Sequence, residues 1–228
     1  MYDYRVEPLG DSAIRMVLAK TISPEVNEHI RKVMWSAKNY KGNGIIEWVP
    51  TYTGVTVHYD PASVSWSTLK STIKQVMETA YKLTLPAAQI YDIPVCYGGE
   101  FGSDLKKIAH QKGMKEEEVI ALHSNRKYLI FMLGFTPGFP YLGGMDEKLA
   151  TPRLDTPRTF VEKGSVGIAG IQTGVYPVAS PGGWNIIGRT PIPLFNPQRE
   201  NPVLLEAGAF LRFYPITRQE YEEISMME

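Results

Sequence analysis

Along the first third of the chain, stretches in which apolar and polar residues alternate are followed by stretches in which apolar residues recur at helical spacing. Between residues 13 and 19, Ile14 and Met16 fall on one face of an extended strand and Arg15 falls on the other. Four stretches are typical of strands: residues 4–8, 13–19, 45–49 and 55–59. Helical spacing of apolar residues predicts helices over residues 24–37 and 66–80, the second capped by Ser65. The order ββαββα predicts an α+β sandwich, with four antiparallel strands covered on one face by two helices.

The rest of the chain is richer in glycine and proline. Residues 90–97 are strand-like, and two short helices are expected to follow, one from Ser103 to a stop at Gly113 and one over residues 115–123. From there on, four short stretches remain strand-like: residues 166–168, 175–178, 185–187 and 203–205. Many short strands with glycine turns favour a β-barrel or closed sandwich. We therefore predict two domains, an α+β domain over residues 1–88 and a mainly-β barrel over residues 89–228.

Composition narrows the classes of function. Among 228 residues, 24 Lys plus Arg balance 24 Asp plus Glu, so no net charge draws the protein to a nucleic acid or a membrane surface. The 43% of hydrophobic residues suffices for a sizeable core. A single cysteine, Cys96, excludes an internal disulfide and a four-cysteine zinc site. Residues 1–5 lack the order of a signal peptide and no apolar run is long enough to cross a bilayer, so we expect a cytoplasmic location.

The most distinctive stretch is Gly134–Gly144, where aromatic rings are interleaved with glycine and proline. Four of its side chains are candidates for ligand contact: Phe135, Pro137, Phe139 and Tyr141. A stiff loop with large apolar faces suits a binding wall, and a loop that plugs one end of a barrel explains the pattern equally well. The tight turn that delivers Trp184 leaves the same two alternatives open.

Three arginines in the same region lie next to proline or glycine: Arg153, Arg158 and Arg189. Guanidinium groups on stiff loops can hold carboxylate or phosphate oxygens, although pairing with Asp155 or Glu162 is the ordinary alternative for any one of them. If they act together, they should converge on a cleft bordered by aromatic rings: Phe139, Tyr141 and Trp184. The glycines between residues 164 and 174 lack the lysine and hydroxyl of a P-loop.

All four histidines precede residue 124, so the glycine-rich region has no imidazole and no thiol of its own. A self-contained Ser-His-Asp or Cys-His site is excluded there, and we predict no bound metal. His123 lies at the edge of this region and joins the three arginines as a candidate catalytic residue, with a favourable helix cap as the alternative. Cys96 is expected to be a buried strand residue rather than a nucleophile.

Several motifs occur in an order and spacing that resemble the KipI family, also called allophanate hydrolase subunit 1 or the 5-oxoprolinase B subunit. They are Gly134-Phe135-Thr136-Pro137-Gly138-Phe139-Pro140-Tyr141-Leu142, Pro152-Arg153, Pro157-Arg158, Gly164-Ser165-Val166, Gln172-Thr173-Gly174-Val175-Tyr176-Pro177, Ser180-Pro181-Gly182-Gly183-Trp184 and Ile187-Gly188-Arg189-Thr190-Pro191. The resemblance is strong over residues 93–215. It departs at Glu162-Lys163, where the family usually has proline and alanine. These motifs add Gln172, Thr173 and Tyr176 to the candidate binding residues.

The resemblance implies that the barrel is cyclophilin-like and that the protein works in a complex. Family members act with a second cyclophilin-like protein, called KipA or the 5-oxoprolinase C subunit, and with a lactam-utilisation subunit. The assembled complex opens 5-oxoproline to glutamate and uses ATP, and no cofactor is expected to be held tightly by this chain. Since neither an ATP fingerprint nor a complete nucleophile–base pair is present, we expect the isolated chain to be inactive. One relative inhibits a sensor histidine kinase, so kinase inhibition is the alternative function.

Overall fold

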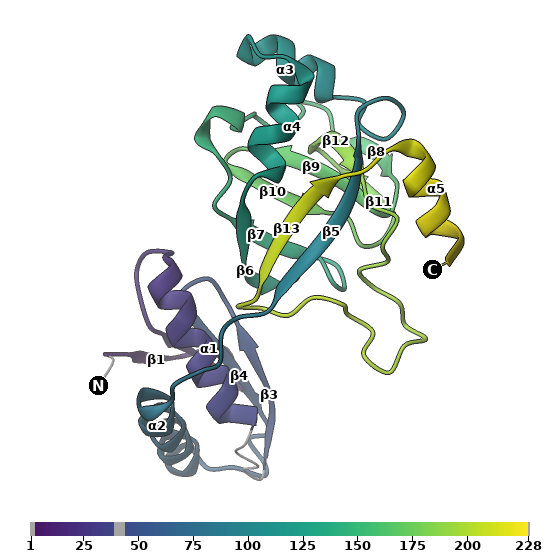
Figure 1. The fold of residues 1–228 in the computed structure, drawn as a ribbon. Helices are drawn as coiled ribbons and strands as arrows, with labels where there is room; N and C mark the ends of the chain where they lie inside the picture. The colour runs from purple at the N-terminus through teal and green to yellow at the C-terminus, as the bar shows by residue number, and fades with distance from the viewer. Residues whose placement is uncertain (1–2, 39–43, 228) are drawn as a thin grey trace. The chain divides into compact units, whose positions relative to one another are not determined.

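The computed structural model describes residues 3–38 and 44–227, and the chain divides into two compact units, residues 1–87 and 88–228 (Figure 1). Met1 and Tyr2, the first residues of the stretch that lacks the order of a signal peptide, lie outside the described residues. Within the described ranges, no helix combines the length and apolar character needed to span a membrane.

The N-terminal unit is a four-stranded sheet with two helices. Its elements are β1 (Arg5–Pro8), β2 (Ala13–Val17), α1 (Pro24–Lys38), β3 (Ile45–Pro50), β4 (Gly54–Tyr59) and α2 (Trp66–Lys82). The strands are antiparallel in the order β1-β2-β4-β3. Alternation along β2 buries Ile14 and Met16 and exposes Arg15, and the inner faces of both helices complete the same core.

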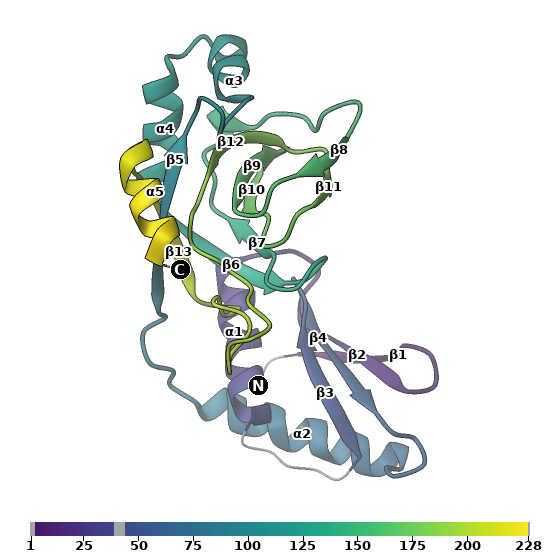
Figure 2. The same ribbon diagram turned by 90° about the vertical axis from the view of Figure 1, so that its right-hand side faces the viewer.

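The second unit is built on a closed barrel of seven strands, in the order β10-β7-β6-β13-β5-β12-β9 (Figures 1 and 2). Its elements are β5 (Ile90–Tyr97), α3 (Leu105–Lys112), α4 (Glu116–Ser124), β6 (Lys127–Leu133), β7 (Pro140–Gly143), the 3₁₀ turn η1 (Glu147–Leu149), β8 (Arg158–Val161), β9 (Ser165–Ala169), β10 (Gln172–Val175), β11 (Ser180–Gly182), β12 (Asn185–Arg189), β13 (Phe210–Pro215) and α5 (Arg218–Met227). Strands β8 and β11 form a separate two-stranded ribbon.

Pairing of β13 with β5 links the end of the chain to the start of the barrel. The two strands are parallel, with Phe210 opposite Ile90, while β13 is antiparallel to β6 on its other edge. The strand predicted over residues 203–205 is wrong, because the structure has only a single bridge there, between Phe195 and Val203. Prolines in this connection lack the N–H that a ladder requires, which favours an irregular path.

Helix ends follow local chemistry. The Ser65 hydroxyl accepts a hydrogen bond from the Thr68 N–H at 3.2 Å and so caps α2. Gly113 ends α3 in the left-handed region, with φ of 64°. The prediction that Ser103 opens α3 is off by one residue, because Asp104 occupies the cap position and its side chain is used elsewhere.

Candidate functional site

A cluster of three aromatic rings fills one part of the barrel unit. Phe139, Tyr176 and Trp184 are all buried, and their rings meet nearly at right angles. The centroid of the Phe139 ring lies 5.8 Å from that of Tyr176 and 5.6 Å from that of Trp184. We call these three rings the aromatic cluster. Since they pack with Val161 and other apolar side chains, the cluster is a small second core rather than an open wall.

The loop of residues 134–139 leads into this cluster and is closed by its own backbone. The Thr136 N–H donates to the Gly134 carbonyl at 2.8 Å, the Phe139 N–H donates to the Thr136 carbonyl at 3.1 Å, and the Gly134 N–H donates to the Phe139 carbonyl at 3.1 Å. Phe135, at the tip, has φ of 67° and is 70% exposed. Pro137 is also exposed, whereas Tyr141 is half-buried beside Phe139. We call residues 134–139 the Phe135 loop.

Arg158 is held by an acid that sequence reasoning missed. Its Nη2 donates to both carboxylate oxygens of Asp104 at 2.8 Å, and its Nη1 donates to the Trp184 carbonyl at 3.1 Å. Asp104 is buried and also accepts from the Ile186 N–H at 2.6 Å. The pair therefore ties β8 to the start of β12. No sequence signal separates Asp104 from an ordinary helix cap, because its partner lies 54 residues away.

The other two arginines differ in position. Burial raises the pKa of Tyr176, and the charges of Arg153 and Arg158 both act against this, so Arg153, although exposed, lies on the side of the aromatic cluster that Arg158 also faces. Arg189 ends β12, whereas Arg158 contacts its beginning, and a strand of five residues separates its ends by roughly 13 Å. The expectation that all three arginines converge on one aromatic cleft is therefore wrong.

His123 sits inside the barrel, fully buried, with both ring nitrogens occupied. Its Nδ1 lies 2.8 Å from the Tyr97 hydroxyl and its Nε2 lies 2.8 Å from Thr173 Oγ1. Thr173 donates its own proton to the Gly167 carbonyl at 3.0 Å, so it accepts from His123 Nε2–H, and Nδ1 accepts from Tyr97. Burial lowers the pKa of His123 to about 3. The neutral ring joins α4 to β5 and β10, and nothing about its position exposes it to a substrate.

Gln172 is half-buried at the start of β10, where it pairs with Ala169 across the ladder. Cys96 is buried in β5, and burial raises the pKa of its thiol, so the thiolate is disfavoured at neutral pH. Within residues 3–38 and 44–227 there is no group of three or more His, Cys, Asp and Glu side chains placed to hold a metal ion.

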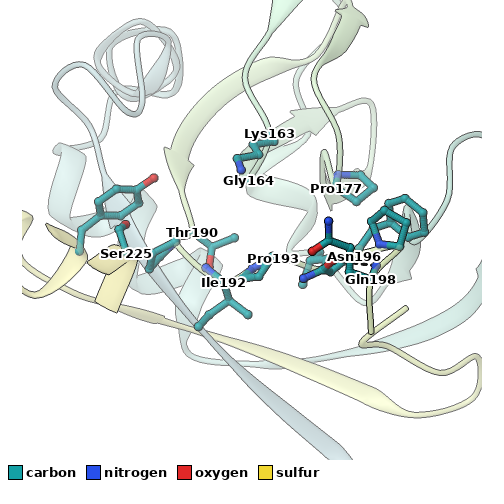
Figure 3. A pocket seen from close by; sticks show the side chains of 14 residues that line it. Lys163, Gly164, Pro177, Thr190, Ile192, Pro193, Asn196, Gln198 and Ser225 are labelled. Atoms are coloured by element: carbon teal, nitrogen blue, oxygen red, sulfur yellow. Dashed lines mark hydrogen bonds between the residues drawn. The ribbon is translucent and has the colours of Figure 1, made fainter. Parts of the chain in front are cut away.

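A groove of about 470 Å³ opens on the barrel unit between α5 and the connection that precedes β13 (Figure 3). Its polar side chains include Lys163, Asn196, Gln198, Tyr221 and Ser225. Four prolines, Ile192, Leu194 and Phe195 form its apolar wall. One lysine beside amides and hydroxyls suits a small polar or anionic ligand. Sequence reasoning did not find this groove, because it combines the ends of three motifs, at Gly164, Pro177 and Thr190-Pro191, with residues 192–198 and α5, which belong to no motif.

Arg189 lies next to this groove rather than in the aromatic cluster. Its guanidinium carbon is 5.3 Å from the centre of the Phe101 ring, and that ring stacks on Tyr221 at 4.4 Å. Its Nε–H is buried and has no hydrogen-bond partner among the described residues. Burial raises the pKa of Tyr221, and the charge of Arg189 acts in the opposite direction.

Comparison with known proteins identifies the family. The pattern of the carboxyltransferase domain, subdomain C and D, matches residues 4–205. The chain belongs to this family. It is 42% identical over 229 aligned residues to the 5-oxoprolinase B subunit of Bacillus subtilis, covering 96% of this chain and 95% of that protein. It is 39% identical to the 5-oxoprolinase B subunit of Escherichia coli O157:H7, covering 91% of this chain and 94% of that one.

Solved structures extend the comparison to longer polypeptides. The crystal structure of TTHA0988 is 34% identical with a TM-score of 0.79, and the match covers 90% of this chain but 40% of that one. The Kluyveromyces lactis urea amidolyase shares the fold at 19% identity and a TM-score of 0.73, with 98% of this chain matched to 15% of that one. The same two units thus occur both as a separate chain and as part of a larger one.

Proposed function

We propose that this chain is the B subunit of a heteromeric, ATP-dependent 5-oxoprolinase, which opens 5-oxoproline to glutamate. The observation that carries the proposal is the 42% identity to the 5-oxoprolinase B subunit of Bacillus subtilis over nearly the whole length of both chains. The two curated relatives named above are both B subunits of 5-oxoprolinase, which gives the kinase-inhibitor alternative no support.

The side chains of the barrel support a role as one part of a composite site. His123 is neutral, enclosed and occupied at both ring nitrogens, so it is not available as a general base. The Cys96 thiol is buried with a raised pKa, so it is a poor nucleophile. Under the proposal, a KipA-type second barrel subunit and a lactam-utilisation subunit supply the groups that this chain lacks.

ATP is expected to bind outside this chain. Hydrolysis of an unstrained five-membered lactam is unfavourable near neutral pH, so the reaction needs coupling to ATP. The glycine-rich stretch of this chain does not fit a phosphate cradle, because its N–H groups are used within the barrel: Gly164 donates to Tyr176 and Gly170 donates to Thr151. A side chain at Gly167 or Gly174 would meet Trp184, so these glycines serve close packing.

The groove of Figure 3 does not carry the proposal. It offers Lys163 to an anion, but the resemblance to the family places alanine at this position. The lysine is therefore not required for a reaction that the family shares. In a 5-oxoprolinase, this groove would modify binding of a small carboxylate rather than define it.

Reconstitution tests the proposal. The purified chain should release no glutamate from 5-oxoproline with or without ATP, and the mixture with both partner subunits should release glutamate only when ATP is added. Omitting this chain from the mixture is the matched control and should abolish turnover. Turnover by the single chain, or full turnover by the mixture without it, would show that the proposal is wrong.

A further inference from the structure

Phe135 has an unusual backbone for a large residue. Of the non-glycine residues in the described ranges, it is the one with a positive φ, 67°. The hydrogen bond from the Thr136 N–H to the Gly134 carbonyl makes Phe135 the centre of a three-residue γ-turn, which is strained when its central φ is positive. Glycine would adopt this turn without strain. The backbone conformation therefore gives no reason for an aromatic residue at this position.

The base of the loop packs closely against the rest of the barrel unit. Gly138, three residues after Phe135, has φ of 80°, and a Cβ there would lie 3.2 Å from the Leu194 carbonyl oxygen. Phe139 anchors the far end of the loop in the aromatic cluster. The Phe135 ring meets this anchor in one T-shaped contact, at 5.6 Å between centroids, and stays 70% exposed. The loop thus presents one large apolar side chain on a rigid base, which lowers the entropy lost when that side chain is immobilised by a partner.

The chemistry of the loop favours an apolar protein surface as its partner. Residues 134–144 contain no charged side chain, so neither a nucleic acid nor an acidic peptide would find an electrostatic contact in the loop itself. Exposed aromatic anchors that fill a pocket on the other protein carry much of the affinity in protein interfaces. Exposure by itself is common, as Phe160 at 57% and Ile171 at 70% show, and strain is what distinguishes Phe135 from them.

We propose that Phe135 is the anchor by which this chain docks onto its partner subunit, whose surface supplies an apolar pocket for the ring. The inference rests on the proposed function. The partner that we propose is the polypeptide equivalent to the remainder of TTHA0988. The match covers 90% of this chain but only 40% of TTHA0988, so most of that longer chain has no counterpart here. The Bacillus subtilis relative is named as a subunit, which indicates that there the two parts are separate chains. In that case a surface contact has to take the place of the covalent link.

Affinity measurements test the docking site. The wild-type chain and three variants, Phe135→Ala, Phe135→Gly and Phe160→Ala, are titrated against the immobilised KipA-type subunit. Both Phe135 variants should bind at least about 30-fold more weakly, as expected for an anchor residue. Phe160→Ala removes another exposed phenylalanine from the same unit and should bind within about threefold of the wild type. Circular dichroism melting curves check that each variant is folded, and the glycine variant keeps the test valid if alanine impairs folding.

The possible failures are distinguishable. If the wild-type chain forms no complex with that subunit, the proposed function fails first. If the wild type binds and the Phe135 variants bind equally well, the proposed function stands and the docking site is wrong. If Phe160→Ala weakens binding as much as the Phe135 variants do, the loss of affinity is not specific to the loop tip, and the assignment of Phe135 as the anchor is wrong. Sedimentation that shows wild-type dimers and monomeric Phe135 variants would assign the ring to a second copy of this chain and overturn the proposal.

Discussion

Phe135 and Phe139 stand four residues apart in one loop and have opposite environments. Phe139 is 3% exposed and packs edge-on against Tyr176 and Trp184, whereas Phe135 is 70% exposed and strained. The buried ring anchors one end of the loop, and three backbone hydrogen bonds within residues 134–139 fix the path that carries the second ring. One motif therefore contains both a structural part and a part that is available for binding.

The same division applies to the polar candidates. Histidine and arginine are residue types that catalysis often uses, but in this fold His123 and Arg158 connect strands and helices through hydrogen bonds to Tyr97, Thr173, Asp104 and Trp184. Lys163 and Phe135 attract less attention by type, and they are the ones that reach the surface, at the groove and at the loop tip. Residue type alone is a weak guide to function here, because hydrogen bonds within the fold occupy both nitrogens of the imidazole and hold the guanidinium against a buried carboxylate.

The largest expected effect concerns the aromatic cluster. Replacing Trp184 by alanine should destabilise the barrel unit by about 3 to 5 kcal/mol, because a buried ring with two edge-on partners is lost and a cavity remains. Hydrogen exchange of the β9 and β12 amides measures this without relying on tryptophan fluorescence.

Phe160→Ala is the matched control for that measurement. It removes an exposed ring from the same unit and should change the stability by no more than about 0.5 kcal/mol. Equal effects of the two substitutions would mean that the aromatic cluster is not a core, and that the contrast between its buried rings and the exposed loop tip is mistaken.

A second, smaller effect is expected from pH. The pKa of His123 is lowered by burial to about 3, below its ordinary value of 6.5, so the unfolded chain binds a proton more readily than the folded one. The contribution of the neutral His123 ring to the free energy of unfolding is complete above pH 6.5. It decreases by about 1.4 kcal/mol per pH unit as the pH falls towards 3. In His123→Gln, which keeps a polar side chain, the free energy of unfolding should depend less steeply on pH by that amount. Urea titrations between pH 4 and 6 compare the two slopes, and parallel slopes would contradict a buried neutral imidazole.

How far the sequence predicts this molecule depends on the range of the interaction. Ser65 and Gly113 mark helix ends through bonds to residues three or four positions away, and the period of two around Ile14 shows which face of β2 is buried. The parallel pairing of Phe210 with Ile90 and the ion pair of Arg158 with Asp104 join residues far apart in the chain, and no local pattern encodes them. The groove at Lys163 is likewise assembled from distant segments. The backbone of Phe135 is local, but it contradicts the preference of the residue, so propensity could not predict it.

The smallest effect gives the most direct test of strain at the loop tip. Alanine is normally preferred to glycine because it restricts the unfolded chain more, by roughly 0.5 to 1 kcal/mol. At φ of 67° the order should reverse, because a left-handed backbone is unfavourable by about 1 to 2 kcal/mol for any residue with a Cβ. Both variants lose the same contact with Phe139, so that contact cancels when they are compared with each other. We therefore expect Phe135→Gly to be more stable than Phe135→Ala by about 0.5 to 1 kcal/mol. In the paired control, Phe160→Gly and Phe160→Ala on β8, where φ is not positive, the ordinary order should hold. If alanine is the more stable residue at both positions, the turn at Phe135 is not strained, and the loop tip loses the feature that separates it from the other exposed apolar side chains.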